Sequence, residues 1–175
     1  MLKQLHYRAI EPSDAMLLYT WYNSDDVTGG MCSRPYPYSL YSIRRAIEVG
    51  EYYSDRQRTL IVEMDGEPIA LGVIRDVDMV NRQAEVGIVI GRTDQWGKGH
   101  SLEIGCELLR ICFDLLGLHR VYSVIHAFNR ISLLMASRYM TKEAVLRDAV
   151  YKDGVYWDNV IYSILKPEWE LEKNK

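Results

Sequence analysis

The sequence predicts an α/β (α+β) protein in which a mixed, mostly antiparallel central sheet is flanked by helices on both faces. Three observations predict this: helical periodicity near the start, a series of β-branched segments after it, and a long hairpin that closes the chain. The expected element order is β-α-α-β-β-β-α-β-α-β-β, which fits helices packed on both sides of one sheet. Because no repeat, low-complexity stretch or linker divides the 175 residues, we expect a single domain over 1–175.

The first elements are a strand and two helices. Residues 5–10 (LHYRAI) form a strand-like run, and Pro12 and Ser13 then suit a helix start. Residues 24–39 are polar and contain Gly and Pro, so a loop is expected there, before a second helix within 39–53. The apolar residues at helical spacing are Ala15, Leu18, Tyr19 and Tyr22 in the first helix and Leu40, Ile43, Ile47 and Tyr52 in the second.

The period then changes to that of strands. Residues 58–64 and 68–77 are strand-like, and Asp65-Gly66 between them predicts a hairpin turn. A third strand is expected at 83–91, which is rich in β-branched residues.

The clearest helix in the sequence covers residues 101–117. A strand at 119–128, a short helix at 129–140 and a hairpin formed by 143–151 and 155–165 complete the chain. The apolar stripe expected on the long helix comprises Leu102, Cys106, Leu109, Phe113 and Leu116.

Composition excludes several classes of protein. The net charge of −3 argues against a nucleic-acid partner held by overall attraction. No stretch is apolar enough to span a membrane, and the first residues do not resemble a signal peptide, so a cytoplasmic location is expected. Three cysteines without a CxxC pair fit neither a disulfide framework nor a zinc knuckle, so Cys32, Cys106 and Cys112 are predicted to be small buried hydrophobes.

A glycine-rich turn, Trp96-Gly97-Lys98-Gly99-His100-Ser101, separates the third β-branched strand from the long helix. Such a turn has a plain structural explanation, since glycine supplies the dihedrals of a tight connection. It also suits an anion, because main-chain N–H groups at a helix start converge on negative charge. Lys98 adds a mobile positive charge beside them.

The element order and three quoted stretches resemble the GNAT superfamily of acyl-CoA-dependent N-acetyltransferases. The stretches are YRAIEPSDA, AEVGIVIGRTDQWGKGHSLEIGCELLRICFDLLGLHRVYSVIHAFNRIS and AVLRDAVYKDGVYWDNVIYSIL. The resemblance is greatest to the branch with ribosomal-protein N-terminal and spermidine acetyltransferases. The family signature is Q/R-x-x-G-x-G/A: Gly99 matches its central glycine, whereas Trp96 and Ser101 depart from it.

The resemblance implies that acetyl-CoA is the co-substrate, with no metal. Its pyrophosphate would lie on the turn formed by Trp96, Gly97, Lys98, Gly99, His100 and Ser101. The backbone of Ile88, Val89 and Ile90 would pair with the pantetheine arm, while their side chains alternate into the core. Asn129 would bond the pantetheine or cap the helix that follows it.

Amine acetylation needs a base, since an alkyl ammonium cannot attack a thioester. Glu85 is the candidate, on the resemblance to a glutamate that several members use; its alternative role is a salt bridge on the strand face. The tyrosine that often serves as the acid falls at Ala136 or Met135, so Tyr139 is either a substitute or a core residue. The remaining histidines, His6, His119 and His126, have no metal-ligand spacing and are predicted to be structural; His100, in the turn, would face phosphate.

The acceptor is expected to be a primary amine: a polyamine, a protein N-terminus or an amino sugar. In the resembled family its groove is built by the first two helices, their loop and the last hairpin. Those segments are rich in Tyr and Trp and carry Asp25, Asp26, Asp153 and Asp158, which suits a cation. The alternative function is an acetyl-CoA-binding sensor or interaction module with weak catalysis. The sequence also allows a homodimer.

Overall fold

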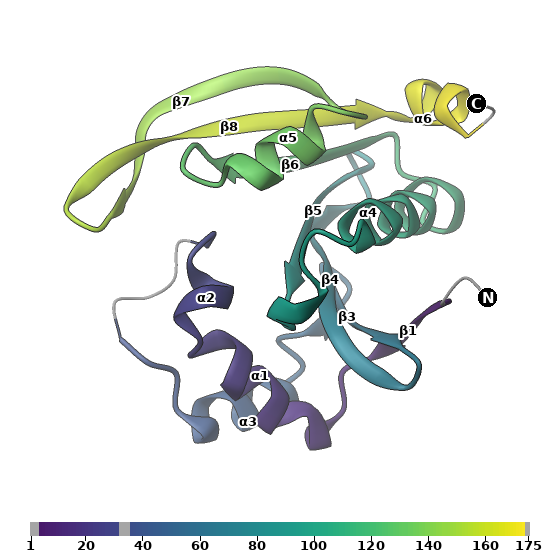
Figure 1. Ribbon diagram of the computed structural model, residues 1–175. Coiled ribbons are helices and arrows are strands. Elements are labelled where there is room, and N and C mark those ends of the chain that lie inside the picture. The colour runs from purple at the N-terminus through teal and green to yellow at the C-terminus, as the bar shows by residue number, and fades with distance from the viewer. Residues whose placement is uncertain (1–3, 32–35, 174–175) are drawn as a thin grey trace.

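The computed structural model describes residues 4–31 and 36–173, which form one twisted sheet with helices packed against it (Figure 1). Seven strands follow the order β1-β3-β4-β5-β6-β8-β7, and β2 pairs with β3. Every pair is antiparallel except β5 with β6. The strands are β1 (Leu5–Ala9), β2 (Tyr53–Ser54), β3 (Gln57–Met64), β4 (Glu67–Asp78), β5 (Gln83–Ile90), β6 (Arg120–His126), β7 (Thr141–Lys152) and β8 (Val155–Leu165). The predicted mixed, mostly antiparallel sheet is confirmed.

The helices pack on both faces of the sheet, as predicted. They are α1 (Ala15–Tyr22), α2 (Asp25–Thr28), α3 (Leu40–Glu48), α4 (His100–Arg110), α5 (Arg130–Ala136) and α6 (Lys166–Glu172), with single turns η1 (Pro12–Asp14), η2 (Thr93–Gln95) and η3 (Ile111–Leu115). Helices α1 and α3 cover Ile61 and Leu71 on one face. Helix α4 covers Val62 and Ala70, which point to the other face because side chains alternate along a strand.

Helix α4 begins where the sequence predicts, but only part of the predicted stripe is buried. Leu109, and Phe113 in the turn after the helix, are buried as predicted, whereas Leu102 and Cys106 are exposed. Ile104 and Leu108, which the predicted stripe leaves out, are fully buried. The prediction that Cys106 is buried is therefore wrong, while the one for Cys112 is confirmed; Cys32 lies outside the described residues. Spacing of four residues along α4 forms the ridge that packs on the sheet.

Three short elements were not predicted. Helix α2 lies within the segment expected to be a loop, and Ser24 accepts a hydrogen bond from Val27 N at its start. Strand β2 is a two-residue extension beside β3. Helix α6 follows the last strand and packs Trp169 against Phe113, with ring centroids 6.1 Å apart. None of the three is long enough to show a period in the sequence.

The two faces of β6 and β8 differ. One face contributes Val121, Ile125, Val160 and Ile164 to the core beneath α4. The core cluster on the α1 and α3 side draws no residue from β6, β7 or β8 among the residues that the structure describes. We call this second surface the open face; its residues are Tyr122, Val124, His126, Asn159, Ile161 and Ser163. Figure 1 shows β7 and β8 as a long two-stranded ribbon whose turn extends beyond β6 toward α2.

No helix of the described residues is long and apolar enough to span a membrane.

Candidate active site

Strands β5 and β6 separate soon after they begin to pair. Their parallel register holds for three residue pairs and ends at Glu85 opposite Tyr122. The Ser123 hydroxyl then donates to the Val86 carbonyl at 2.8 Å, which closes the apex of the opening. Beyond it, β5 still pairs with β4 on its other edge through Ile90. Along the predicted stretch Ile88, Val89 and Ile90, the main-chain groups of Val89 face β4, and those of Ile88 and Ile90 face the opening, where the Ile90 carbonyl accepts from the Trp96 indole. The β5 edge therefore offers the main-chain groups of Ile88 and the Ile90 N–H to a ligand.

The side chains of this stretch alternate as expected. Ile88 and Ile90 pack against the core under α4, and Val89 packs against the core under α1 and α3. The two roles foreseen for these residues are compatible, since packing uses their side chains and leaves the strand edge free.

The glycine-rich turn continues directly from β5. Gly97 and Gly99 have positive φ angles of 74° and 88°, and a Cβ built on either would meet nothing within 4 Å. The glycines are thus required by the backbone conformation, and the space outside the turn is open. Gly99 is the N-cap of α4, so the first amides of the helix have no partner within it.

Several hydrogen-bond donors of the turn have no partner among residues 4–31 and 36–173. Within the described part of the chain, the backbone N–H groups from Gly97 to Ser101 donate to no backbone carbonyl. His100 Nε2 is buried without a hydrogen-bond partner among the described residues. Lys98 Nζ lies 3.3 Å from Gln95 Oε1, and the Trp96 indole donates to the Ile90 carbonyl at 3.1 Å. Unpaired amides, a helix N-terminus and a lysine together fit a phosphate-bearing ligand.

Glu85 lies at the apex of the opening and is ion-paired. Its Oε1 accepts a hydrogen bond of 2.5 Å from Arg75 Nη2 across the β4–β5 ladder. Glu85 is 7% exposed, so the salt bridge that was its alternative role is present and buried on one side. The pair sits beside a β-bulge at which Asp76 has a φ of 51°.

Burial and the carboxylate of Glu85 both affect the pKa of Tyr122, a residue of the open face. Burial raises the pKa of the Tyr122 phenol, and the carboxylates of Glu85 and Asp76 raise it further. The Glu85 side chain lies on the same side of the sheet as Tyr122, because the two residues are register partners. Glu85 is thus placed where the opening meets the open face.

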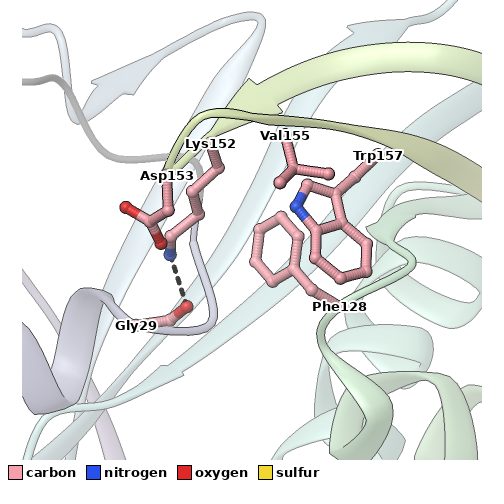
Figure 2. Close-up of a pocket in the computed structure, with 6 residues that line it drawn as sticks. All are labelled: Gly29, Phe128, Lys152, Asp153, Val155 and Trp157. Carbon is pink, nitrogen blue, oxygen red and sulfur yellow. Dashed lines mark hydrogen bonds between the residues drawn. The ribbon is translucent and has the colours of Figure 1, made fainter.

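A pocket of about 280 Å³ lies at the far end of that face, between the β7–β8 turn and the end of α2. Figure 2 shows the ring of Phe128 facing Val155 and Trp157, with Lys152, Asp153 and Gly29 closing the other side. Phe128 and Trp157 meet edge to face, with centroids 5.6 Å apart.

Lys152 fixes the wall of this pocket. Its Nζ donates to the carbonyls of Gly29 at 2.5 Å and Met31 at 3.0 Å, and lies 4.6 Å from the centroid of Phe128. These contacts tie the tip of the hairpin to the end of α2, across more than one hundred residues of sequence.

Comparison with known proteins identifies the family. Residues 4–139 match the family described as acetyltransferase (GNAT) domain. The chain belongs to the GNAT acetyltransferase family. It is 26% identical over 171 residues to the SPbeta prophage-derived uncharacterized N-acetyltransferase YokL of Bacillus subtilis, covering 97% of this chain and 94% of that protein.

Solved structures share the fold of this GNAT chain. Spermidine N-acetyltransferase from Vibrio cholerae, in complex with CoA and spermine, superposes with a TM-score of 0.88 at 22% identity, covering 95% of this chain and 98% of that one. A probable acetyltransferase of known structure superposes with a TM-score of 0.83 at 28% identity, and the match covers 94% of each chain. The family assignment makes this protein an acyltransferase.

Asn129 is the N-cap of α5. Its Oδ1 accepts a hydrogen bond from Ser132 N at 3.1 Å, so the predicted helix-capping role is confirmed. Its Nδ2 donates to the Gly30 carbonyl at 2.9 Å, which holds the segment after α2 against the end of β6.

Tyr139 lies in the core beside α4. Burial raises the pKa of its phenol, with a further contribution from Cys106. A Cβ added to Gly105 would lie 3.1 Å from the Tyr139 hydroxyl, so this oxygen is directed at α4. The core role that the sequence left open for Tyr139 agrees with this packing.

The sequence reasoning missed a contact made by His126. Its Nδ1 lies 2.7 Å from Asn159 Oδ1, and its ring stacks on Phe128 with centroids 5.2 Å apart. Asn159 lies on β8, 33 residues further along the chain, so no local spacing could reveal this contact, whereas Phe128 follows His126 by two residues. The one available signal was alternation along β6, which puts His126 on the same face as Tyr122. No group of three or more potential metal ligands occurs among the described residues.

Proposed function

We propose that this GNAT acyltransferase moves the acetyl group of acetyl-CoA to a primary amine by direct attack of the amine on the thioester. The observation that carries the proposal is the continuity of the β5 free edge with the Gly97–Ser101 turn. The first suits a pantetheine arm that pairs with a strand edge, and the second suits a pyrophosphate.

The residues expected to hold acetyl-CoA fit it. Gly97 to Ser101 supply unpaired amides, with Lys98 and His100 beside them. Acetyl-CoA supplies the activated acyl group and a thiolate leaving group. The chain supplies orientation, a place for the developing oxyanion, and routes for the protons.

The acceptor is proposed to reach the thioester from the open face. The pocket beside Phe128 and Trp157 has aromatic walls, the carboxylate of Asp153 and the ammonium of Lys152, which two main-chain carbonyls hold. The aromatic rings and the carboxylate suit a cationic amine. The Vibrio cholerae relative of this fold was solved with spermine, which supports a small amine. Polyamines, peptide N-termini and amino sugars all remain in the class that we propose.

Glu85 is proposed to act as a general base through a water molecule. Arg75 keeps the Glu85 carboxylate in place at the apex of the opening, and one side of the residue meets the open face. A base in this position can remove a proton from an amine that approaches Tyr122.

The direct test is acetyl transfer by the purified chain. Acetyl-CoA consumption, with mass measurement of the products, is followed with polyamines, peptides with free N-termini, amino sugars and simple aromatic amines. We expect one class to gain a single acetyl mass per amine. Tight binding of acetyl-CoA with no acetylated product from any class would instead support the alternative function, a binding module.

A further inference from the structure

His126 is held in a form that can accept a proton. The amide oxygen of Asn159 has lone pairs and no hydrogen, so its 2.7 Å contact with His126 Nδ1 requires that Nδ1 carry the hydrogen. In the neutral ring the lone pair is then on Nε2. Asn159 therefore selects the tautomer in which Nε2 is the basic atom.

His126 lies beside the opening between β5 and β6, on the face from which the acceptor is proposed to enter. His126 ends β6, beyond the point at which β5 and β6 separate. It lies on the open face with Tyr122, about 13 Å further along the strand at the usual rise per residue. A thioester between the two separated strands would thus have Glu85 near one end of its acceptor side and His126 near the other.

The surroundings of His126 link it to the pocket. The stacked ring of Phe128 is also a wall of the pocket, together with Trp157. Charged groups toward this part of the open face include Lys152, whose Nζ lies 4.6 Å from the centroid of Phe128, Asp153 at the hairpin tip and, further along the face, the Arg75–Glu85 pair. An amine that entered beside Phe128 would meet the ring on which the imidazole stacks.

Two protons must leave an ammonium acceptor during acetylation. One ends on the sulfur of CoA and one in solvent, because the products are an amide and a thiol. Glu85, acting as a base through water, would pass one proton to solvent. For the proton that ends on sulfur the sequence offered only Tyr139, as a substitute acid, and Tyr139 packs against the core beside α4.

We propose that His126 Nε2 takes the proton that the acceptor nitrogen sheds when the C–N bond forms and delivers it to the CoA thiolate, with Asn159 as the positioning residue. Before that, the ammonium loses its other proton to solvent through water beside Glu85, and the neutral amine attacks the acetyl carbonyl carbon. The C–S bond breaks with its electron pair on sulfur, and the imidazolium gives its proton to that sulfur. The inference rests on the proposed function.

The test uses His126→Gly with an acceptor that the wild type acetylates. We expect kcat to fall by about 100-fold or more, and added imidazole to restore at least about tenfold of it, since a free base can fill the vacated space. His6→Gln, at an exposed histidine beside Glu63, is the matched control and should leave kcat unchanged. Acetyl-CoA affinity should stay within about threefold of wild type in both variants.

Two substitutions at Asn159 test whether the His126 tautomer matters. They also test the proposal if the His126→Gly protein does not fold. Asn159→Asp keeps an acceptor opposite Nδ1 and should retain kcat within about threefold, whereas Asn159→Leu should lower it about tenfold or more. Equal effects of the two would overturn the assignment.

The remaining outcomes are also decisive. A folded His126→Gly enzyme with kcat within about twofold of wild type, or with a loss that imidazole does not restore, overturns the inference alone and leaves the acetyltransferase activity standing. A wild-type chain that acetylates no acceptor overturns the proposed function and this inference with it.

Discussion

The two halves of the sheet are covered differently. Strands β3 and β4 have α1 and α3 on one face and α4 on the other, and Ile61, Val62, Ala70 and Leu71 are fully buried. Among the described residues, strands β6 and β8 contribute only to the core beneath α4, and β7 is exposed along most of its length. The covered half provides the core, whereas polar groups that could do chemistry gather where a covering helix is missing.

The difference in covering is visible in the burial patterns along the strands. The run Ile69-Ala70-Leu71-Gly72 is buried without interruption, as expected for a strand between two layers. Strand β8 instead alternates buried Val160 and Tyr162 with Asn159 and Ile161, as expected for a strand with one core face. The open face can therefore hold His126 and Asn159 at little cost to the core.

The largest effect is expected from Gly99→Asp. The substitution places a carboxylate against the proposed phosphate site, so the rise in melting temperature that acetyl-CoA gives the wild type should disappear. Gly66→Asp is the matched control, because Gly66 has a φ of 80° and open space around it but lies in the β3–β4 turn of the covered half. A Gly99→Asp protein that still binds acetyl-CoA as tightly as the Gly66→Asp protein would move the phosphate site elsewhere.

Glu85→Gln should lower kcat by about two to four orders of magnitude if Glu85 is the base. The loss should shrink as pH rises, because more of the amine is then already neutral. Glu63→Gln removes a comparable ion-paired carboxylate, bonded to Arg8 at 2.6 Å in the covered half, and should leave kcat unchanged. Rates of the Glu85 variant within about twofold of wild type at every pH would remove Glu85 from the mechanism.

Stability measurements compare the two halves directly. Leu71→Ala, at a fully buried site between two layers, should lower the free energy of unfolding by about 2–5 kcal/mol in chemical denaturation. Leu146→Ala on β7, where the side chain is 47% exposed, should cost less than about 1 kcal/mol. Similar losses at the two positions would show that the β7–β8 ribbon is covered in solution, as a second copy of the chain could do.

The smallest effect is expected at Tyr139. Tyr139→Phe keeps the ring in the core and deletes only the hydroxyl, so kcat should fall by less than about tenfold, below the usual range for the loss of an acid. A much larger drop, in a variant that still melts and binds acetyl-CoA like the wild type, would make Tyr139 the acid and weaken the case for His126.

The sequence predicts what local pattern determines. The long strands, the turn at Gly97–Ser101 and the start of α4 each carry a period or a glycine signal, and all are present. Helix α2 offered only a capping Ser24 before Asp25 and Asp26, which is too short a signal to separate from a loop. For α4, the apolar residues allow more than one stripe, and the position of the sheet selects Ile104 and Leu108 over Cys106.

The site was less predictable than the fold because its contacts are long-range. Glu85 is proposed as the base from the family resemblance, and its partner Arg75 follows only from the β4–β5 register. His126 and Asn159 are 33 positions apart, and their contact depends on the pairing of β6 with β8. Such pairs are set by the sheet topology and not by any local spacing.

The most direct test of the account is a crystal structure of the chain with CoA and an acetylated acceptor. The account predicts pyrophosphate oxygens within about 3 Å of the N–H groups of Gly97 to Ser101, pantetheine along the free edge of β5, and the acceptor on the open face near Glu85 and His126. A coenzyme bound away from the turn, or an acceptor that reaches the sulfur from the α4 side of the sheet, would contradict it.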